Sequence, residues 1–161
     1  MPRIDLPRLP DDSRVWIFGI TPALDEGQQP RFLAEVDRFL EGWAAHGEPI
    51  ASARDLREGV FLIVAAGRDA ETSGCSIDRM FGTLQTLERE LAVSVLDGSR
   101  VFVRHGDGRP EGMSRSEFRE KADPHTIVFD TTAATLGQIR SGAWERRAAD
   151  SWHRDLLRRV V

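Results

Sequence analysis

The fold class is decided by residues 49–66, which read PIASARDLREGVFLIVAA. The second part of this stretch, residues 60–66, is apolar at every position and short, which predicts a strand that is buried on both faces. The first part, residues 49–57, has the length of another strand, and Glu58-Gly59 is a tight connection between the two. The sequence therefore predicts a β-hairpin in the middle of the chain, with its second strand fully buried.

An amphipathic helix is predicted on each side of this hairpin. In residues 30–46 the apolar side chains that share one helical face are Phe32, Val36, Phe39, Leu40 and Trp43. Pro30 suits the first turn of this helix, and Gly47 after His46 can supply a left-handed end. In residues 75–93 the corresponding face consists of Ile77, Met80, Leu84, Leu87 and Leu91.

A further strand is predicted at each end of this arrangement. Residues 14–20 are a β-branched and aromatic run, and residues 93–103 are rich in strand formers around Asp97-Gly98. Asp-Gly is a hairpin signal, so the second run is either one bent strand or two short ones. The order β-α-β-β-α-β over residues 14–104 fits an α+β fold, the ferredoxin-like split βαβ sandwich. That fold serves many functions and selects none of them.

The ends of the chain are expected to differ from this core. Residues 1–13 hold three prolines and predict an extended arm. After the core, residues 105–112 predict a glycine-rich loop, and Ser114 with Glu117 has the capping-box spacing that begins a short helix. The other elements expected in the α/β extension, which covers residues 105–161 and packs on the core, are a strand at 126–129 and helices at 132–141 and 143–158.

The charge balance argues against a nucleic-acid partner. The 161 residues carry 26 acidic and 22 basic side chains, for a formal charge of −4, whereas nucleic-acid binders usually show a basic face. Trp144 and Trp152 lie in an arginine-rich tail and could stack on bases. The simpler interpretation is that both tryptophans pack between helices.

The cysteine, histidine and hydropathy patterns exclude further classes. A single cysteine, Cys75, leaves no internal disulfide. Three histidines, His105, His125 and His153, are scattered without the spacing of metal ligands. No apolar run approaches the roughly 20 residues of a membrane span, and the N-terminus lacks the apolar centre of a signal peptide. We therefore expect a cytoplasmic protein with no membrane partner, no metal and no cofactor.

The most distinctive chemistry lies in the sequence Ser-Gly-Cys-Ser-Ile-Asp at residues 73–78, where a loop meets the start of the second predicted helix. Unpaired backbone N–H groups and the helix dipole converge there, so a thiolate at Cys75 or a bound anion is stabilised. The residues expected to surround or attract that anion are Ser73, Gly74, Ser76 and Arg79.

A structural role for the same residues is the alternative. Ser73 then serves as a helix cap and Cys75 as a small buried side chain. His46 is a candidate base for a reactive Cys75. However, a split βαβ sandwich places the end of its first helix and the start of its second at opposite ends of the helical layer. The simpler interpretation of His46 is a favourable cation at a helix C-terminus.

Three strings together make the chain similar to a known group of proteins. They are Ser13-Arg14-Val15-Trp16-Ile17, Trp43-Ala44-Ala45-His46-Gly47 and Ser73-Gly74-Cys75-Ser76-Ile77-Asp78. Over most of residues 10–105 the chain resembles small bacterial proteins of uncharacterised function that are often labelled "ABC transporter ATPase". The resemblance implies that the S-G-C-S-I-D turn is characteristic of the group.

The label is not matched by a nucleotide-binding motif. An ATPase of that type needs a G-x-x-x-x-G-K-[ST] loop whose lysine meets the phosphates. The only lysine, Lys121, follows Glu120 without that glycine pattern. ATPase activity is therefore not expected.

We expect a non-catalytic module that binds a ligand or a partner at residues 73–78. The ligand would be a small anion, and the partner another protein or a second copy of this chain. The alternative is a thiol-based redox or covalent activity centred on Cys75. Both hypotheses depend on Cys75 lying at a helix N-terminus, within reach of solvent.

Overall fold

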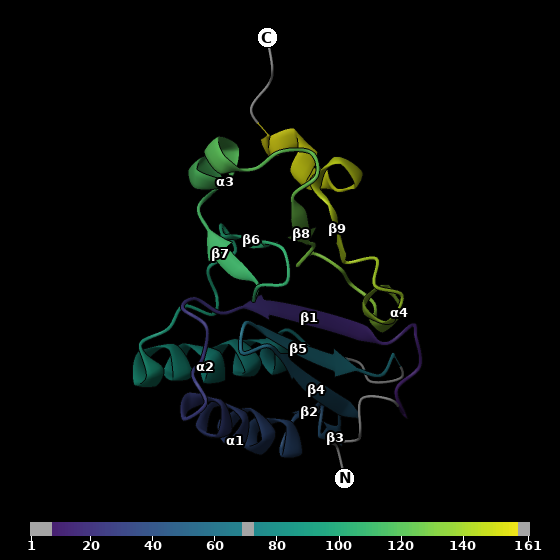
Figure 1. Cartoon of the computed structure of the whole chain (residues 1–161). Helices are drawn as coiled ribbons and strands as arrows, with labels where there is room; N and C mark the ends of the chain where they lie inside the picture. The colour runs from purple at the N-terminus through teal and green to yellow at the C-terminus, as the bar shows by residue number, and fades with distance from the viewer. Residues whose placement is uncertain (1–7, 69–72, 158–161) are drawn as a thin grey trace.

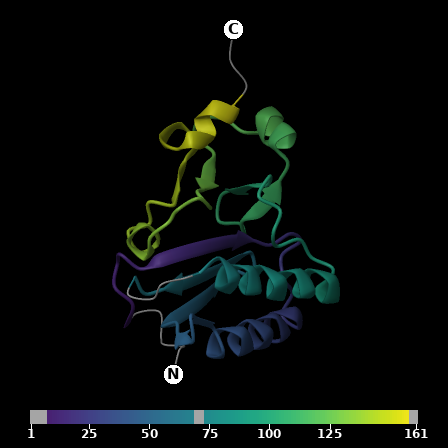
Figure 2. The same cartoon turned by 180° about the vertical axis from the view of Figure 1, so that it is seen from behind.

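The structure, a computed structural model, describes residues 8–68 and 73–157. Over these residues the chain has an α+β fold with two main antiparallel sheets, which lie one above the other in Figure 1. Two long helices cover the outer face of the lower sheet (Figures 1 and 2). Of the short helices, one lies beside the lower sheet and the others lie at the far end of the upper sheet. The α+β class predicted from the sequence is confirmed.

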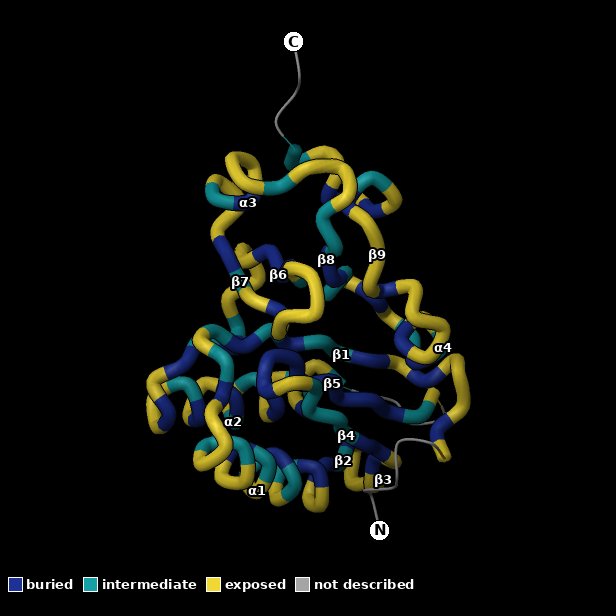
Figure 3. Tube along the Cα trace, in the orientation of Figure 1, coloured by how far each residue is buried: buried dark blue, intermediate teal, exposed yellow. Residues whose placement is uncertain are grey.

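The lower sheet contains the predicted hairpin. Strand β5 (Phe61–Ala66) lies between β1 (Arg14–Gly19) and β4 (Ser52–Arg57) and is antiparallel to both. Glu58 and Gly59 close the hairpin with φ values of 56° and 69°, the backbone signature of a type I′ turn. All six residues of β5 are buried, as the dark blue of the tube in Figure 3 shows. Alternate β5 side chains belong to two different buried clusters, so each face of this central strand is covered.

The helices α1 (Gln28–Glu41) and α2 (Gly74–Leu91) form the first of these layers. Their apolar stripes pack with alternate β5 side chains, including Leu62 and Val64, in one buried cluster. The helical part of that cluster consists of Phe32, Val36, Leu40, Met80, Leu84, Leu87 and Leu91.

The first helix is shorter than predicted. It ends at Glu41, and a small hairpin follows, formed by β2 (Ala44–Ala45) and β3 (Glu48–Pro49). His46 and Gly47 make its turn with φ values of 53° and 79°. A helix cannot pass through two consecutive left-handed residues, so the expected position of His46 at a helix C-terminus is wrong.

The four-stranded ferredoxin-like sheet is not formed by the described residues. Ser94 reaches the outer edge of β1 in one isolated bridge with Thr21. The chain then leaves this sheet and forms β6 (Val101–Arg104) in the other one. The ring of Phe102 packs on Gly19, where a Cβ atom would lie only 2.1 Å from Phe102 Cε2. Residues 101–104 thus belong to the other sheet and contact the end of β1 through Phe102, instead of pairing with the edge of β1.

The upper sheet has the strand order β7-β6-β8-β9. Strand β8 (Ile127–Phe129) and helix α3 (Arg115–Lys121) lie where the sequence predicts them. Strands β7 (Glu111–Met113) and β9 (Glu145–Arg147) were not predicted. The remaining elements of this part are helix α4 (Leu136–Arg140) and the 3₁₀-helices η2 (Ala148–Asp150) and η3 (Trp152–Leu156).

The predicted helix at 143–158 is therefore wrong. Its first residues pair with β8, and Ser151 is extended, with φ −126° and ψ 164°, between the two 3₁₀-helices. Trp144 is buried, as predicted. However, it packs against Phe61 and Phe129 and not between helices, and each ring centroid lies 5.0 Å from its own. Packing of Trp144 in this aromatic cluster outweighs the helical preference of the segment.

The aromatic cluster joins the two sheets. Phe61 of β5 contacts Phe102, Phe129 and Trp144, and these residues belong to the buried cluster that covers the second face of the lower sheet. Leu9 belongs to the same cluster and is 4% exposed. The described part of the predicted N-terminal arm is therefore packed on the fold, whereas residues 1–7 lie outside the described residues.

Candidate functional site

The start of α2 uses two serines to hold the fold together. Ser73 is the N-cap, and its hydroxyl oxygen accepts a hydrogen bond from the Ser76 N–H at 3.1 Å. The Ser76 hydroxyl donates to the Ser73 carbonyl at 2.7 Å, and the Ser76 carbonyl accepts from the buried indole of Trp43 at 2.9 Å. Ser76 is 2% exposed. Its hydroxyl therefore faces the core and is not available to a ligand.

Cys75 lies where the sequence predicts it. It is the second residue of the 18-residue helix α2, and it is exposed. Gly74 and Arg79 are exposed as well. Of the five residues expected to form a site here, the structure leaves Gly74, Cys75 and Arg79 at the surface, keeps Ser73 as a half-buried cap and turns Ser76 inward.

A second cluster of polar residues lies on α3. Ser114 caps this helix by accepting a hydrogen bond from the Glu117 N–H at 3.1 Å, as its spacing predicts. Arg115, Ser116 and Arg119 then line one pocket together with Leu156 of η3, which we call the α3 pocket. Within residues 8–68 and 73–157, neither guanidinium group of this pocket forms an ion pair, whereas Glu117 is engaged by Lys121 at 2.8 Å.

Next to the α3 pocket lies a buried polar pair. Ser151 Oγ lies 2.7 Å from Nδ1 of His153, and the two residues are 8% and 2% exposed. Burial lowers the pKa of His153 to about 4, an effect that Asp130 opposes and Arg115 reinforces. Because the charged imidazolium is disfavoured in a dry site, His153 is neutral at neutral pH.

The indole of Trp152 lies at the surface beside this pair. Trp152 is 38% exposed, and it stacks on His153 with ring centroids 4.0 Å apart and an interplanar angle of 24°. Its Nε1–H donates to Asp130 at 3.1 Å. The expectation that Trp152 packs inside a helix layer is therefore wrong.

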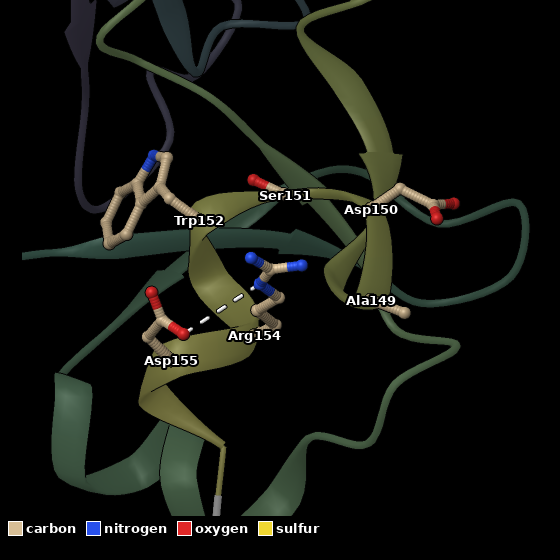
Figure 4. A pocket seen from close by; sticks show the side chains of 6 residues that line it. All are labelled: Ala149, Asp150, Ser151, Trp152, Arg154 and Asp155. Atoms are coloured by element: carbon tan, nitrogen blue, oxygen red, sulfur yellow. Dashed lines mark ion pairs between the residues drawn. The ribbon is translucent and has the colours of Figure 1, made fainter.

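A pocket opens beside Trp152, and Figure 4 shows its lining. We call it the Trp152 pocket. Its residues are Ala149, Asp150, Ser151, Trp152, Arg154 and Asp155. In the view of Figure 4, Trp152 and Asp155 lie on one side, Asp150 lies on the other, and Arg154 lies between the two carboxylates.

Only part of these two pockets could be predicted from the sequence. Arg115 and Arg119 are four residues apart after a capping serine, so a shared helical face was readable. That Leu156 closes this face, and that Asp130 fixes an indole 22 residues later, depends on how β8 and η3 pack. No pattern of local spacing reports such a contact.

No protein-family model, curated protein or solved structure matches the chain. The resemblance based on the S-G-C-S-I-D turn therefore stays a prediction. In the described part of the chain no helix is long and apolar enough to cross a membrane. The same residues contain no cluster of three or more histidine, cysteine or acidic side chains arranged to hold a metal ion.

Proposed function

We propose that the protein is a non-catalytic binding module and that it holds a small phosphate-bearing ligand in the α3 pocket. The observation that carries this proposal is the pair Arg115 and Arg119. Both guanidinium groups line the same pocket, and neither is neutralised by a carboxylate of the described residues. Two positive charges on one helical face, neither of them in an ion pair with a described residue, attract an anion.

The chemistry of the lining favours phosphate over a simple halide. A guanidinium group offers a planar fork of N–H donors that matches the oxygens of a phosphate. The Ser116 hydroxyl adds a donor that can follow the ligand's geometry. Leu156 supplies an apolar wall, which suits a ligand with a carbon skeleton attached to its phosphate.

The turn at residues 73–78 is a weaker place for the same anion. The cap at Ser73 already satisfies the Ser76 N–H, and the Ser76 hydroxyl is committed to the Ser73 carbonyl. The cap leaves an anion only the backbone N–H groups that precede Ser76 in α2. To reach the Ser76 N–H, the anion would have to displace a cap that contributes about 1 kcal/mol to a helix. The α3 pocket requires no such exchange.

A binding role fits the neighbouring chemistry better than catalysis. The pair Ser151 and His153 resembles half of a nucleophile-and-base arrangement. However, its histidine has a pKa of about 4, so it is a weak base at neutral pH. Asp130, whose carboxylate would have to orient the imidazole, is engaged by Thr132 and Trp152.

Isothermal titration with inorganic phosphate, at low ionic strength, tests the proposal. We expect Arg115→Gln and Arg119→Gln each to weaken binding about tenfold, because each removes a charge-assisted hydrogen-bond donor. Arg89→Gln is the matched control, since Arg89 is an exposed arginine of α2. Equal affinities in all four proteins would contradict the site, and an equal loss in the control would reduce the effect to net charge.

A thiol-based activity at Cys75 is the second candidate, favoured by the exposure of this residue in the first turn of α2. Unpaired N–H groups at a helix start stabilise a thiolate. The measurement is the rate of alkylation as a function of pH, with Ser73→Ala as a variant that weakens the helix start and Cys75→Ser as the blank. An alkylation rate no higher than that of a cysteine in an unstructured peptide would remove this candidate.

A protein partner, including a second copy of this chain, is a further part of the proposal. Sedimentation of the purified protein with and without phosphate separates the two cases. A monomer that binds phosphate in the titration above supports a small-ligand module, and a stable dimer supports pairing of two copies.

A further inference from the structure

We propose that the Trp152 pocket is a separate site that binds a neutral sugar ring against the indole. The two pockets share no lining residue, so this site goes beyond the proposed phosphate binding and stands or falls independently of it. Three features of the pocket carry the inference: a fixed aromatic surface, a polar rim, and a charge balance that selects against strongly charged ligands.

The aromatic surface is fixed before any ligand arrives. His153 covers one face of the Trp152 ring, and Asp130 holds the indole N–H. Asp130 is itself oriented by the backbone N–H and the hydroxyl of Thr132. A side chain held at both its ring face and its polar edge loses little conformational entropy when a ligand stacks on it. Among the large hydrophobic side chains of the described residues, Trp152 is the exposed one.

The polar rim comes from η2 and η3. Arg154 and Asp155 form a loose ion pair, with 3.8 Å between Arg154 Nε and Asp155 Oδ1, and their side chains are 68% and 79% exposed. Such a pair contributes little to stability and can turn toward a ligand at small cost. Asp150 is already held by Arg147 at 2.9 Å. The groups that can turn toward a ligand are therefore the carboxylate of Asp155 and the guanidinium of Arg154.

This combination matches a sugar ring. A pyranose has an apolar face of C–H groups, which packs on an aromatic ring, and a rim of hydroxyl groups that both donate and accept hydrogen bonds. Asp155 can accept from one hydroxyl, and Arg154 can donate to its neighbour. Because the two charges cancel, the rim offers no net attraction for a cation or a phosphate. A nucleobase shares the stacking preference but lacks the hydroxyl rim.

Nuclear magnetic resonance of the full chain tests this inference through the indole N–H signal of Trp152. That signal is identified by its loss in Trp152→Phe. Methyl β-glucoside and N-acetylglucosamine at millimolar concentration are the probes, with adenosine for comparison. We expect a sugar to shift the Trp152 signal while the signal of the buried Trp144 stays in place. Arg154→Gln and Asp155→Asn should weaken that response several-fold, whereas Asp107→Asn should not, because Asp107 is an exposed residue of the loop between β6 and β7 and does not line the pocket.

The opposite outcomes are distinct. If neither sugar shifts the Trp152 signal, or if adenosine shifts it and the sugars do not, the inference is overturned. A sugar response that survives both Arg154→Gln and Asp155→Asn overturns the proposed rim. Because Arg154 and Asp155 are exposed, these variants are expected to fold, which the unchanged signal of Trp144 verifies. Loss of phosphate binding in Arg115→Gln leaves the sugar response untouched, which distinguishes the two sites.

Discussion

At the scale of single residues, the fold tolerates an ionisable side chain in its interior by keeping it neutral. His153 is 2% exposed and is hydrogen-bonded to Ser151. Its ring makes a T-shaped contact with the ring of Phe118. An uncharged imidazole meets this environment with one hydrogen bond and two ring contacts. Its protonated form would lose hydration without gaining a bonded carboxylate. The proton is therefore bound more weakly in the folded chain than in the unfolded one.

This difference predicts a loss of stability in mild acid. Well above pH 6.5, the ordinary pKa of a histidine, His153 is neutral in both states. As the pH falls from 6.5 to about 4, the unfolded chain takes up a proton that the folded chain refuses. The free energy of unfolding should fall by up to about 3 kcal/mol over this window. Urea denaturation across that pH range is the measurement.

The matched variant for this prediction is the double substitution Ser151→Ala with His153→Phe. It keeps an aromatic ring and leaves no buried hydroxyl without a partner. It should flatten the slope between pH 6.5 and 4, whereas His125→Gln at an exposed position should keep it. The same slope in the double variant and the native protein would show that other groups cause the acid sensitivity.

At the scale of elements, two glycines leave room for one aromatic ring at the boundary between the two sheets. Gly19 ends β1, and the ring of Phe102 occupies the space that a Cβ would take. Gly112 of β7 also packs close to the Phe102 ring, with a Cβ position 2.9 Å from Cε1. A side chain at either glycine would collide with the Phe102 ring, so both positions favour glycine.

We therefore expect Gly19→Ala to destabilise the protein by about 1–3 kcal/mol, the usual cost of overpacking a core. Gly82→Ala is the control, because nothing lies within 4 Å of its Cβ position in α2 and alanine favours a helix. In the background of Phe102→Ala, Gly19→Ala should cost much less. Thermal unfolding of the four proteins gives this double-mutant cycle, and strict additivity would refute the contact.

At the scale of the whole molecule, one arginine connects the two sheets at the surface above the aromatic cluster. Arg104 of β6 binds both carboxylate oxygens of Glu58, at 2.9 and 2.8 Å, and Glu145 of β9 at 2.8 Å. Glu58 belongs to the turn of the lower hairpin. The hydrogen bonds with Glu58 raise the pKa of Arg104, and Arg104 in turn lowers the pKa of Glu58. The guanidinium also lies over the ring of Phe129.

Arg104→Gln should lower the free energy of unfolding by about 2 kcal/mol, since it removes a bidentate and a single charge-assisted bond at once. Arg100→Gln, which loosens a surface pair with Asp97 at 3.5 Å, should cost less than about 1 kcal/mol. Chemical denaturation measures both. Similar losses in the two variants would mean that the connection between the sheets rests on the aromatic cluster alone.

The sequence by itself determined the local elements whose apolar spacing is unambiguous. The hairpin around Glu58-Gly59, the helix that starts after Ser73 and the capped helix after Ser114 lie where they are predicted. Each of these depends on interactions among residues close in the chain: turn geometry, a cap or one amphipathic face. The position of Cys75 at the exposed start of α2 follows from the same local rules.

Only the tertiary structure decided which sheet residues 101–104 join and which part of 143–158 forms a strand instead of a helix. It also decided which side chains meet in the α3 and Trp152 pockets. Phe102 over Gly19, Trp144 against Phe61, and Trp152 on Asp130 join residues that are far apart in the chain. Contacts of this kind depend on shape and burial across layers. Shape and burial across layers produce no periodic pattern in the sequence. A short apolar or polar segment can pack against several different partners, and only the arrangement of the layers selects one.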